Sequence, residues 1–247
     1  MSWRTALRVV GGLVLAVPSV ACAGEPADLL AYFPERVSTY GVEVDRLFLV
    51  ILGITGAMFL LVEGALLWCL IRYWHRARPK ASYVHGNKVA EVIWTVIPAI
   101  IVVWLALSSQ RVWARIRGAP PPHQVEVEVT AEQFAWNIRY PGSDGQFDTS
   151  DDVTTINQLH LPVHQVVLVR LRSKDVVHSF FLPEFRFKQD AVPGLTGRLW
   201  LEAVKTGQFE IVCAEHCGLG HYRMRGFLTI ESPEAFQAWL SGQIVTE

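Results

Sequence analysis

Two long apolar runs near the N-terminus restrict this 247-residue chain more than any other feature of its sequence. The first extends from Leu47 to Leu70 with Glu63 as its only charged residue, and the second extends from Val92 to Gln110 without any. A helix needs about 20 apolar residues, at about 1.5 Å each, to cross the hydrocarbon core of a bilayer. Both runs are long enough, so we expect two transmembrane helices in contact with membrane lipid.

The composition agrees with a membrane protein that also carries a polar domain. Apolar residues make up 51% of the chain and charged residues 18%, and the mean hydropathy is +0.27. The formal net charge is −1. The chain therefore lacks the basic field that nucleic-acid binding needs, and we expect no nucleic-acid partner.

The N-terminus has the pattern of a signal peptide over residues 1–23. Arg4 and Arg8 precede an apolar run that ends in small residues around Cys22, as is typical of a cleavage site. Lipidation of Cys22 and retention of the run as an uncleaved anchor are the alternatives. We expect residues 24–46 to form an exported segment outside the membrane.

Basic residues between the two apolar runs set the predicted topology. Residues 72–90 contain several lysines and arginines and no acidic residue, and positively charged loops remain in the cytoplasm. We therefore expect a transmembrane helix over residues 47–71, a cytoplasmic loop over 72–90 and a second transmembrane helix over 91–110. The prediction is a multi-pass protein of a bacterial-type inner membrane, with everything after residue 110 on the outer, periplasmic side.

The second half of the chain changes to the alternating pattern of β-strands. A proline-rich linker over residues 111–123 precedes a domain over 124–232, and Ser232 and Pro233 begin a closing helix and tail over 233–247. Short segments that alternate polar with β-branched or aromatic residues indicate a small β-sandwich or Greek-key barrel. The predicted strands are Gln124–Thr130, Gln133–Tyr140, Gln165–Arg172, Arg198–Ala203, Gln208–Cys213 and Met224–Ile230.

The segment from Cys213 to Met224 gathers side chains that bind soft metals. It contains two thiols, at Cys213 and Cys217, the imidazole of His221 and the thioether of Met224. Thiolate and thioether sulfur together favour copper over zinc. Two thiolates can bridge two copper ions that share one unpaired electron, which keeps reorganisation on reduction small. His178, which we place at the end of a strand, is the candidate for the remaining histidine.

Other interpretations of this segment stay open at the level of the sequence. Cys213 and Cys217 could form a disulfide, since the predicted domain lies outside the cell. Together with His221 and a distant histidine they could bind a structural zinc ion. One cysteine, two histidines and Met224 would make a mononuclear blue-copper site, which leaves the second cysteine without a role. Four histidines are expected to be solvated or structural rather than ligands: His123, His160, His164 and His216.

Together these motifs resemble subunit II of the haem–copper cytochrome c oxidases. The resemblance runs from about residue 40 to 232, through the helix pair, the His178-Ser-Phe strand, the Lys188–Gly194 segment and the Cys-x-Glu-x-Cys-x-x-x-His-x-x-Met pattern. It implies a two-helix transmembrane hairpin followed by a cupredoxin-like Greek-key β-barrel. It also implies a binuclear copper centre, called CuA, and a magnesium ion bound by Glu215 at the border with subunit I. The implied copper ligands are His178, Cys213, Glu215, Cys217, His221 and Met224.

The resemblance further implies a place in respiration, as the subunit through which electrons reach a proton-pumping cytochrome c oxidase. A cytochrome c-type donor would supply electrons, which would pass to haem in subunit I for the reduction of oxygen to water. Subunit III is a further expected partner. The family's electron-accepting tryptophan is replaced by Phe134, so electrons are expected to enter at Phe134 or Trp136. Glu91 matches a glutamate at the mouth of a proton channel, although a carboxylate that merely stabilises a helix start would look the same.

Functions of other classes fit the motifs less well. A quinol oxidase subunit would lack the copper ligands, and a copper chaperone would need exposed, exchangeable ones. A CuA subunit of a membrane nitric oxide reductase is the alternative, although the segment Glu91–Pro98 favours the oxidase. Four aspartates could steer a basic donor but are more typical of turns: Asp144, Asp148, Asp151 and Asp152.

Overall fold

The computed structural model describes residues 33–74, 83, 85–142 and 144–243. The predicted signal peptide with Cys22, part of the exported segment and part of the cytoplasmic loop fall outside these residues. From Glu35 onward the chain forms one compact unit.

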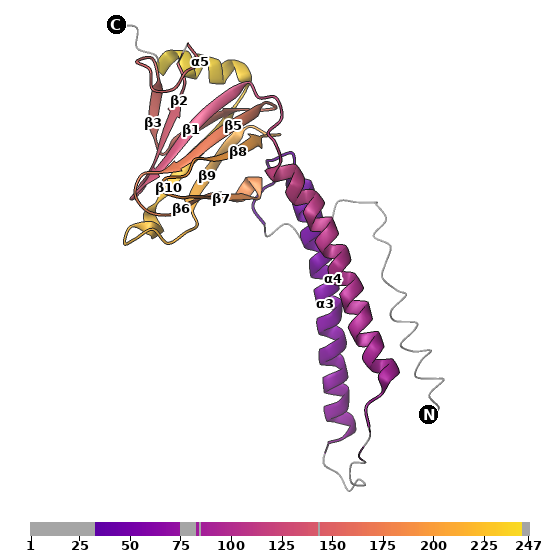
Figure 1. The fold of residues 1–247 in the computed structure, drawn as a ribbon. Helices are drawn as coiled ribbons and strands as arrows, with labels where there is room; N and C mark the ends of the chain where they lie inside the picture. The colour runs from indigo at the N-terminus through magenta and orange to yellow at the C-terminus, as the bar shows by residue number, and fades with distance from the viewer. Residues whose placement is uncertain (1–32, 75–82, 84, 143, 244–247) are drawn as a thin grey trace. The chain divides into compact units, whose positions relative to one another are not determined.

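Two long helices, α3 (Gly41–Arg72) and α4 (Lys88–Arg117), contain the predicted membrane spans (Figure 1). Both are long and apolar enough to cross a membrane, and their most apolar stretches are not buried inside the protein. The described part of the chain contains two such helices. The expectation of a multi-pass protein is therefore corrected to a protein with two membrane spans.

The second helix is longer than the sequence pattern predicted. Asn87 caps its start, because Asn87 Oδ1 accepts hydrogen bonds from the backbone N–H groups of Val89 and Ala90 at 3.1 and 3.2 Å. At the other end the helix continues to Arg117 through part of the expected linker, since neither glycine nor proline occurs between Pro98 and Gly118. The connection to the next domain is therefore shorter than predicted.

Two five-stranded sheets form the second domain, in the orders β3-β2-β1-β5-β8 and β4-β10-β9-β6-β7. The pairs β1–β5 and β4–β10 are parallel, and the other pairs are antiparallel. Apolar side chains between the sheets form one core. This arrangement confirms the expected cupredoxin-like β-domain behind two apolar helices. The strands are β1 (Val125–Glu132), β2 (Ala135–Tyr140), β3 (Val153–Ile156), β4 (Gln158–Pro162), β5 (Val166–Ser173), β6 (His178–Leu182), β7 (Phe187–Ala191), β8 (Gly197–Glu202), β9 (Gly207–Cys213) and β10 (Arg225–Glu231).

Three of these strands, β3, β4 and β7, were not predicted from the sequence. His178 lies at one end of a strand, as expected, because it opens β6. Most of β6 is buried, so it lacks the polar–apolar alternation that reveals a half-exposed strand. The strand expected from Gln133 starts only at Ala135, since residues 133–134 form the turn between β1 and β2.

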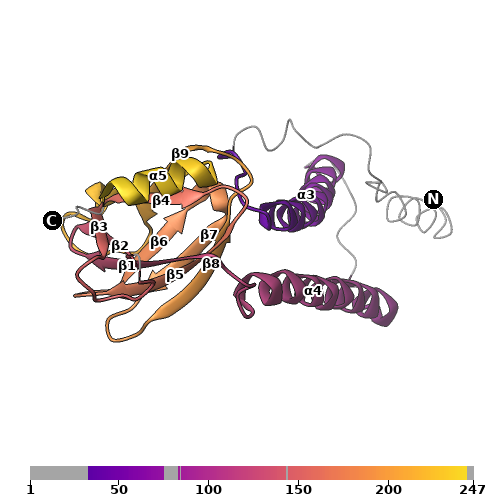
Figure 2. The ribbon, with the colours of Figure 1, turned by 90° about the horizontal axis from the view of Figure 1, so that it is seen from above.

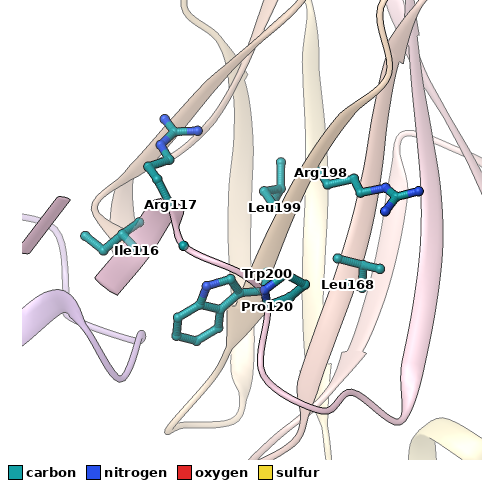
Figure 3. Close-up of a pocket in the computed structure, with 8 residues that line it drawn as sticks. Ile116, Arg117, Pro120, Leu168, Arg198, Leu199 and Trp200 are labelled. Atoms are coloured by element: carbon teal, nitrogen blue, oxygen red, sulfur yellow. The ribbon is translucent and has the colours of Figure 1, made fainter. Parts of the chain in front are cut away.

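A small hollow lies where the end of α4 meets β5 and β8 (Figure 3). Its lining includes Ile116 and Arg117 at the end of α4, Pro120 just after it, and Leu168, Leu199 and Trp200 of β5 and β8. Its volume is about 20 Å³, which accommodates a water molecule but no cofactor. The functional site must therefore be sought elsewhere.

The closing helix α5 (Pro233–Gln243) packs against β4 and β10 (Figure 1 and Figure 2). Ser232 Oγ accepts a hydrogen bond from Ala235 N at 3.2 Å, which is the cap predicted from the sequence. Trp239 of this helix stacks on His160 of β4, with ring centroids 4.0 Å apart and planes within 8°. His160 is thus structural, as expected.

The partly buried position of His160 predicts a dependence of stability on pH. Burial lowers the pKa of His160, and the nearby Glu231 carboxylate, 3.3 Å from His160 Nδ1, only partly offsets this. The neutral imidazole is therefore the form that folding favours. Its contribution to stability is present above the ordinary histidine pKa of about 6.5 and is lost as the pH falls below that value. Chemical unfolding at about pH 7.5 and about pH 5.5 should show a smaller loss of stability on acidification in His160→Gln than in the unaltered protein. The exposed His123→Gln is the control, and equal pH dependence in all three proteins would contradict the prediction.

Candidate metal centre

The loop from β9 to β10 turns so that the thiols of Cys213 and Cys217 face each other. Their Sγ atoms lie 3.8 Å apart, whereas a disulfide bond measures about 2.05 Å. Both cysteines are free and buried, so the structure does not contain the disulfide that was one interpretation of the pair. Cys213 N donates to Met224 O across the two ends of the loop at 3.3 Å, which keeps the loop closed.

Each thiol has a histidine beside it. His178 Nδ1 lies 4.0 Å from Cys213 Sγ, and His221 Nδ1 lies 3.7 Å from Cys217 Sγ. His178 is fully buried and comes from β6, while His221 opens the short 3₁₀ helix η2 (His221–Arg223) within the loop. Two elements distant in sequence therefore supply one cluster.

The remaining two predicted ligands also lie beside the two thiols. Met224 Sδ is 3.7 Å from Cys217 Sγ, and the backbone oxygen of Glu215 is 3.3 Å from Cys213 Sγ. The structure thus brings all six predicted ligand residues together. His216 is exposed beside His221, with ring centroids 5.5 Å apart, and adds no contact to the thiols.

This donor set has the chemistry to hold copper. Metal–thiolate bonds measure about 2.3 Å, so two sulfurs can bind the same ion only if they lie within about 4.6 Å of each other. The 3.8 Å between Cys213 and Cys217 meets that limit. Six donor groups exceed the four of a structural zinc site, and the thioether of Met224 favours copper. Burial, followed by the neighbouring Cys213, raises the pKa of the Cys217 thiol to about 11. A bound metal ion must therefore displace a proton from that thiol.

Asp175 orients His178. Its Oδ1 lies 2.8 Å from His178 Nε2, which leaves Nδ1 of the same ring directed at Cys213. Asp175 also accepts backbone hydrogen bonds from Gln133 and Val176, both at 2.7 Å. Burial opposes ionisation of Asp175, but these hydrogen bonds outweigh it and lower the pKa of the carboxyl. No role was predicted for Asp175, although a carboxylate three residues before a candidate ligand histidine was a usable indication.

The two aromatic residues proposed for electron transfer occupy different depths. Phe134 is 38% exposed and lies against the loop between β9 and β10, residues 214–224, which we call the ligand loop. A Cβ added to Gly220 of this loop would be 2.4 Å from the Phe134 ring. The Gln133 side chain donates a hydrogen bond to the carbonyl of Cys217 beside it. Trp136 is fully buried, with its ring centroid 6.3 Å from that of His178. Of the two, only Phe134 can touch another protein.

The other predicted functional residues lie outside this cluster. Glu91 is in the first turn of α4. The aspartates of the β2–β3 loop make local contacts typical of turn residues. Asp148 and Asp152 form ion pairs with Arg139, and Asp144 Oδ1 accepts a hydrogen bond from Gln146 N at 2.8 Å. These contacts fit the prediction that the four aspartates are turn residues rather than a surface that steers an electron donor.

Comparison with known proteins agrees with the geometry of the cluster. The family model for the cytochrome c oxidase subunit II transmembrane domain matches residues 26–112. The family model for the subunit II periplasmic domain matches residues 127–231. The chain belongs to the cytochrome c oxidase subunit II family. This subunit II is 35% identical over 212 residues to the alternative cytochrome c oxidase subunit 2 of Bradyrhizobium diazoefficiens, which covers 77% of this chain and 76% of the relative. It is 31% identical over 260 residues to cytochrome c oxidase subunit 2 of Thermostichus vulcanus, which covers 83% and 76%.

A solved structure is also similar in part. The periplasmic domain of cytochrome oxidase subunit II of Bradyrhizobium japonicum is 26% identical and covers 51% of this chain and 96% of that chain, with a TM-score of 0.46. Family membership makes this subunit II a part of a haem–copper oxidase, a membrane-bound oxidoreductase complex, and copper is the metal typical of the family.

Replacing Asp175 by asparagine should weaken copper binding without unfolding the domain. An amide keeps one acceptor oxygen but replaces the other by an NH₂ donor, so it cannot accept from both His178 Nε2 and Gln133 N, and it loses the negative charge beside the ring. We expect copper affinity to fall by about 10- to 100-fold, as for other residues that orient a ligand histidine. Competition with a copper chelator measures this. Asp148→Asn, in an exposed turn, is the matched control, and equal affinities for both variants would contradict the assigned role.

Replacing Gly220 by alanine should destabilise the copper-free domain by about 1–3 kcal/mol, because the new methyl group overlaps the Phe134 ring. Adding Phe134→Ala should recover most of this loss by making room. Denaturant unfolding of the single and double variants measures both effects. Leu219→Ala, at a residue 93% exposed in the same loop, should change little. A double variant no more stable than Gly220→Ala would show that the close approach of the ring does not matter.

Proposed function

We propose that this chain is the electron-accepting subunit of a respiratory cytochrome c oxidase. It takes single electrons from a cytochrome c-type donor through a binuclear CuA centre and delivers them to haem in subunit I. Oxygen is reduced to water there, coupled to proton pumping. The observation that carries the proposal is the pair of facing thiols, 3.8 Å apart, with four further donor groups around it: those of His178, His221, Met224 and Glu215.

The protein's part in this function is to fix the donor groups in advance. Copper in such a site exchanges single electrons with little change in its ligands. Antiparallel pairing of β6 with β9 sets Phe180 opposite Cys213, and Ala214 N donates to Ser179 O at 3.0 Å. Ser179 Oγ in turn donates to Asp190 Oδ1 at 2.7 Å. Rigid donors limit the reorganisation that accompanies each electron transfer.

Electrons enter, in this proposal, at Phe134. Its ring combines an exposed edge with contact to the glycines of the ligand loop, so a docked donor would be separated from the ligands by one side chain. Trp136 lies behind it against His178 and Phe180, with ring centroids 6.3 and 5.4 Å away. The role of Trp136 is to hold the buried histidine in place and to extend the path inward.

Two carboxylates have proposed roles at the border with other subunits. Glu215 directs its carbonyl toward Cys213, while the residue as a whole is exposed. Its carboxylate is the proposed magnesium ligand shared with subunit I. Glu91, at the start of α4 on the side that the basic loop places in the cytoplasm, is the proposed site of proton uptake. Subunit III is the further proposed partner, and the leader over residues 1–23 is proposed to be removed on export.

Rapid mixing of the purified oxidase complex with reduced cytochrome c, without oxygen, tests the proposal. Oxidation of the cytochrome should be followed by reduction of haem in subunit I. Cys217→Ser should slow the first step by at least about 100-fold, because the change removes a ligand that no water can replace. His216→Ala should leave the rate unchanged, since His216 does not contact the thiols. Unaltered rates in Cys217→Ser, or turnover of nitric oxide in place of oxygen, would overturn the proposal.

A further inference from the structure

Glu63 places a carboxyl group inside the first membrane span. It is the only charged residue of α3 between Arg46 and Arg72. At about 1.5 Å per residue, it lies roughly 14 Å along the helix from Arg72, well within a hydrocarbon core about 30 Å thick. The glutamate side chain is too short to reach water from that depth. Ionisable groups in such positions usually face protein or a polar cavity instead of lipid.

Glu63 lies on a side of α3 that is only partly covered. The partly covered apolar residues of α3 include Leu47, Val50 and Ile54 on one side and Leu49 on the other, and Glu63 is itself partly covered. At about 100° per residue, Glu63 is roughly 180° around α3 from Ile54. Among the described residues Glu63 has no hydrogen bond or ion pair.

Small residues lie on this side of α3 among larger apolar ones such as Phe59 and Leu67. Gly56 lies about 20° from Glu63 around the helix, and Gly53 and Gly64 lie within about 100°. A Cβ added at any of these three glycines would have no atom within 4 Å. Small residues let two membrane helices approach closely, and a polar side chain beside them forms a hydrogen bond to the helix that packs there.

We propose that Glu63 is the contact at which α3 packs against a transmembrane helix of oxidase subunit I, and that this helix presents a hydrogen-bond donor at the depth of Glu63. Lipid tails offer no donor, and the described part of this chain offers none to Glu63. A lysine, arginine, serine or threonine side chain would satisfy the carboxyl. This inference rests on the proposed assembly with subunit I. It adds the face of α3 that makes the contact and the chemistry of the group that Glu63 meets.

Glu63→Leu in the full oxidase separates this contact from exposure to lipid. If Glu63 faced lipid, leucine would be neutral or favourable, since leucine is preferred in a membrane helix. If Glu63 meets a donor, we expect the retention of subunit I by affinity-purified subunit II, in increasing detergent, to weaken by roughly three- to thirtyfold. Glu63→Gln should stay within about twofold, because its amide oxygen still accepts a hydrogen bond. Unchanged retention in Glu63→Leu would overturn the inference.

Two controls identify the face and the partner. Glu63→Leu combined with Val62→Glu keeps a carboxyl at nearly the same depth but turns it about 100° around the helix. This double variant should not restore retention, and restoration would contradict a specific contact. A photo-crosslinking residue at Leu67, about 40° from Glu63, should attach to subunit I, whereas one at Leu61, about 160° away, should not. Attachment of Leu67 to a second copy of this chain or to its own N-terminal segment would overturn the assignment.

The same preparations distinguish this inference from the proposed function. Copper content and reduction of the copper domain by cytochrome c should be unchanged in Glu63→Leu, because Glu63 is not part of the cluster around Cys213 and Cys217. Loss of retention with intact copper chemistry supports the contact. Loss of copper chemistry in the unaltered complex would refute the proposed function and leave the measurement on Glu63 interpretable.

Discussion

Antiparallel pairing of β6 with β9 is the contact on which the candidate metal centre depends. It sets Phe180 opposite Cys213, and it places His178, two residues earlier in β6, on the same face of the sheet. A slip of one residue would turn His178 away from the thiols. The loop that follows Cys213 then needs only to return Cys217, His221 and Met224 to the same point, which its closure onto β10 achieves. The site is thus a rigid strand pair completed by one short loop.

The surroundings of this site share one physical task, which is to hold polar donors in a buried place. Asp175 supplies the acceptor for His178 Nε2, the ring nitrogen that does not face the thiols. The backbone N–H groups of Gln133 and Val176 in turn donate hydrogen bonds to Asp175. The Gln133 side chain reaches the Cys217 carbonyl, so the β1–β2 turn braces the ligand loop as well. Phe134 sits in that turn. The residue proposed to meet the electron donor is therefore fixed by the same contacts that fix the ligands.

Much of the molecule could be predicted from its sequence, and the failures have physical causes. The membrane helices were found because length and hydropathy decide them. The residues that gather around Cys213 and Cys217 were found because soft donors at close spacing are rare by chance. The strand β7 was missed because Lys188 and Asp190 interrupt its apolar pattern. The extension of α4 to Arg117 was missed because charged residues replace apolar ones there without breaking the helix. Asp175 was missed because its role depends on a hydrogen bond, which spacing alone does not display.

The central claim is that Cys213 and Cys217 hold two copper ions as one electronic unit. The electron paramagnetic resonance spectrum of the copper-loaded protein tests this most directly, with His216→Ala recorded alongside. The account predicts hyperfine structure from one unpaired electron shared equally by two copper nuclei, and the same spectrum in His216→Ala. Hyperfine structure from a single copper nucleus, or loss of the shared-electron spectrum in His216→Ala, would contradict it.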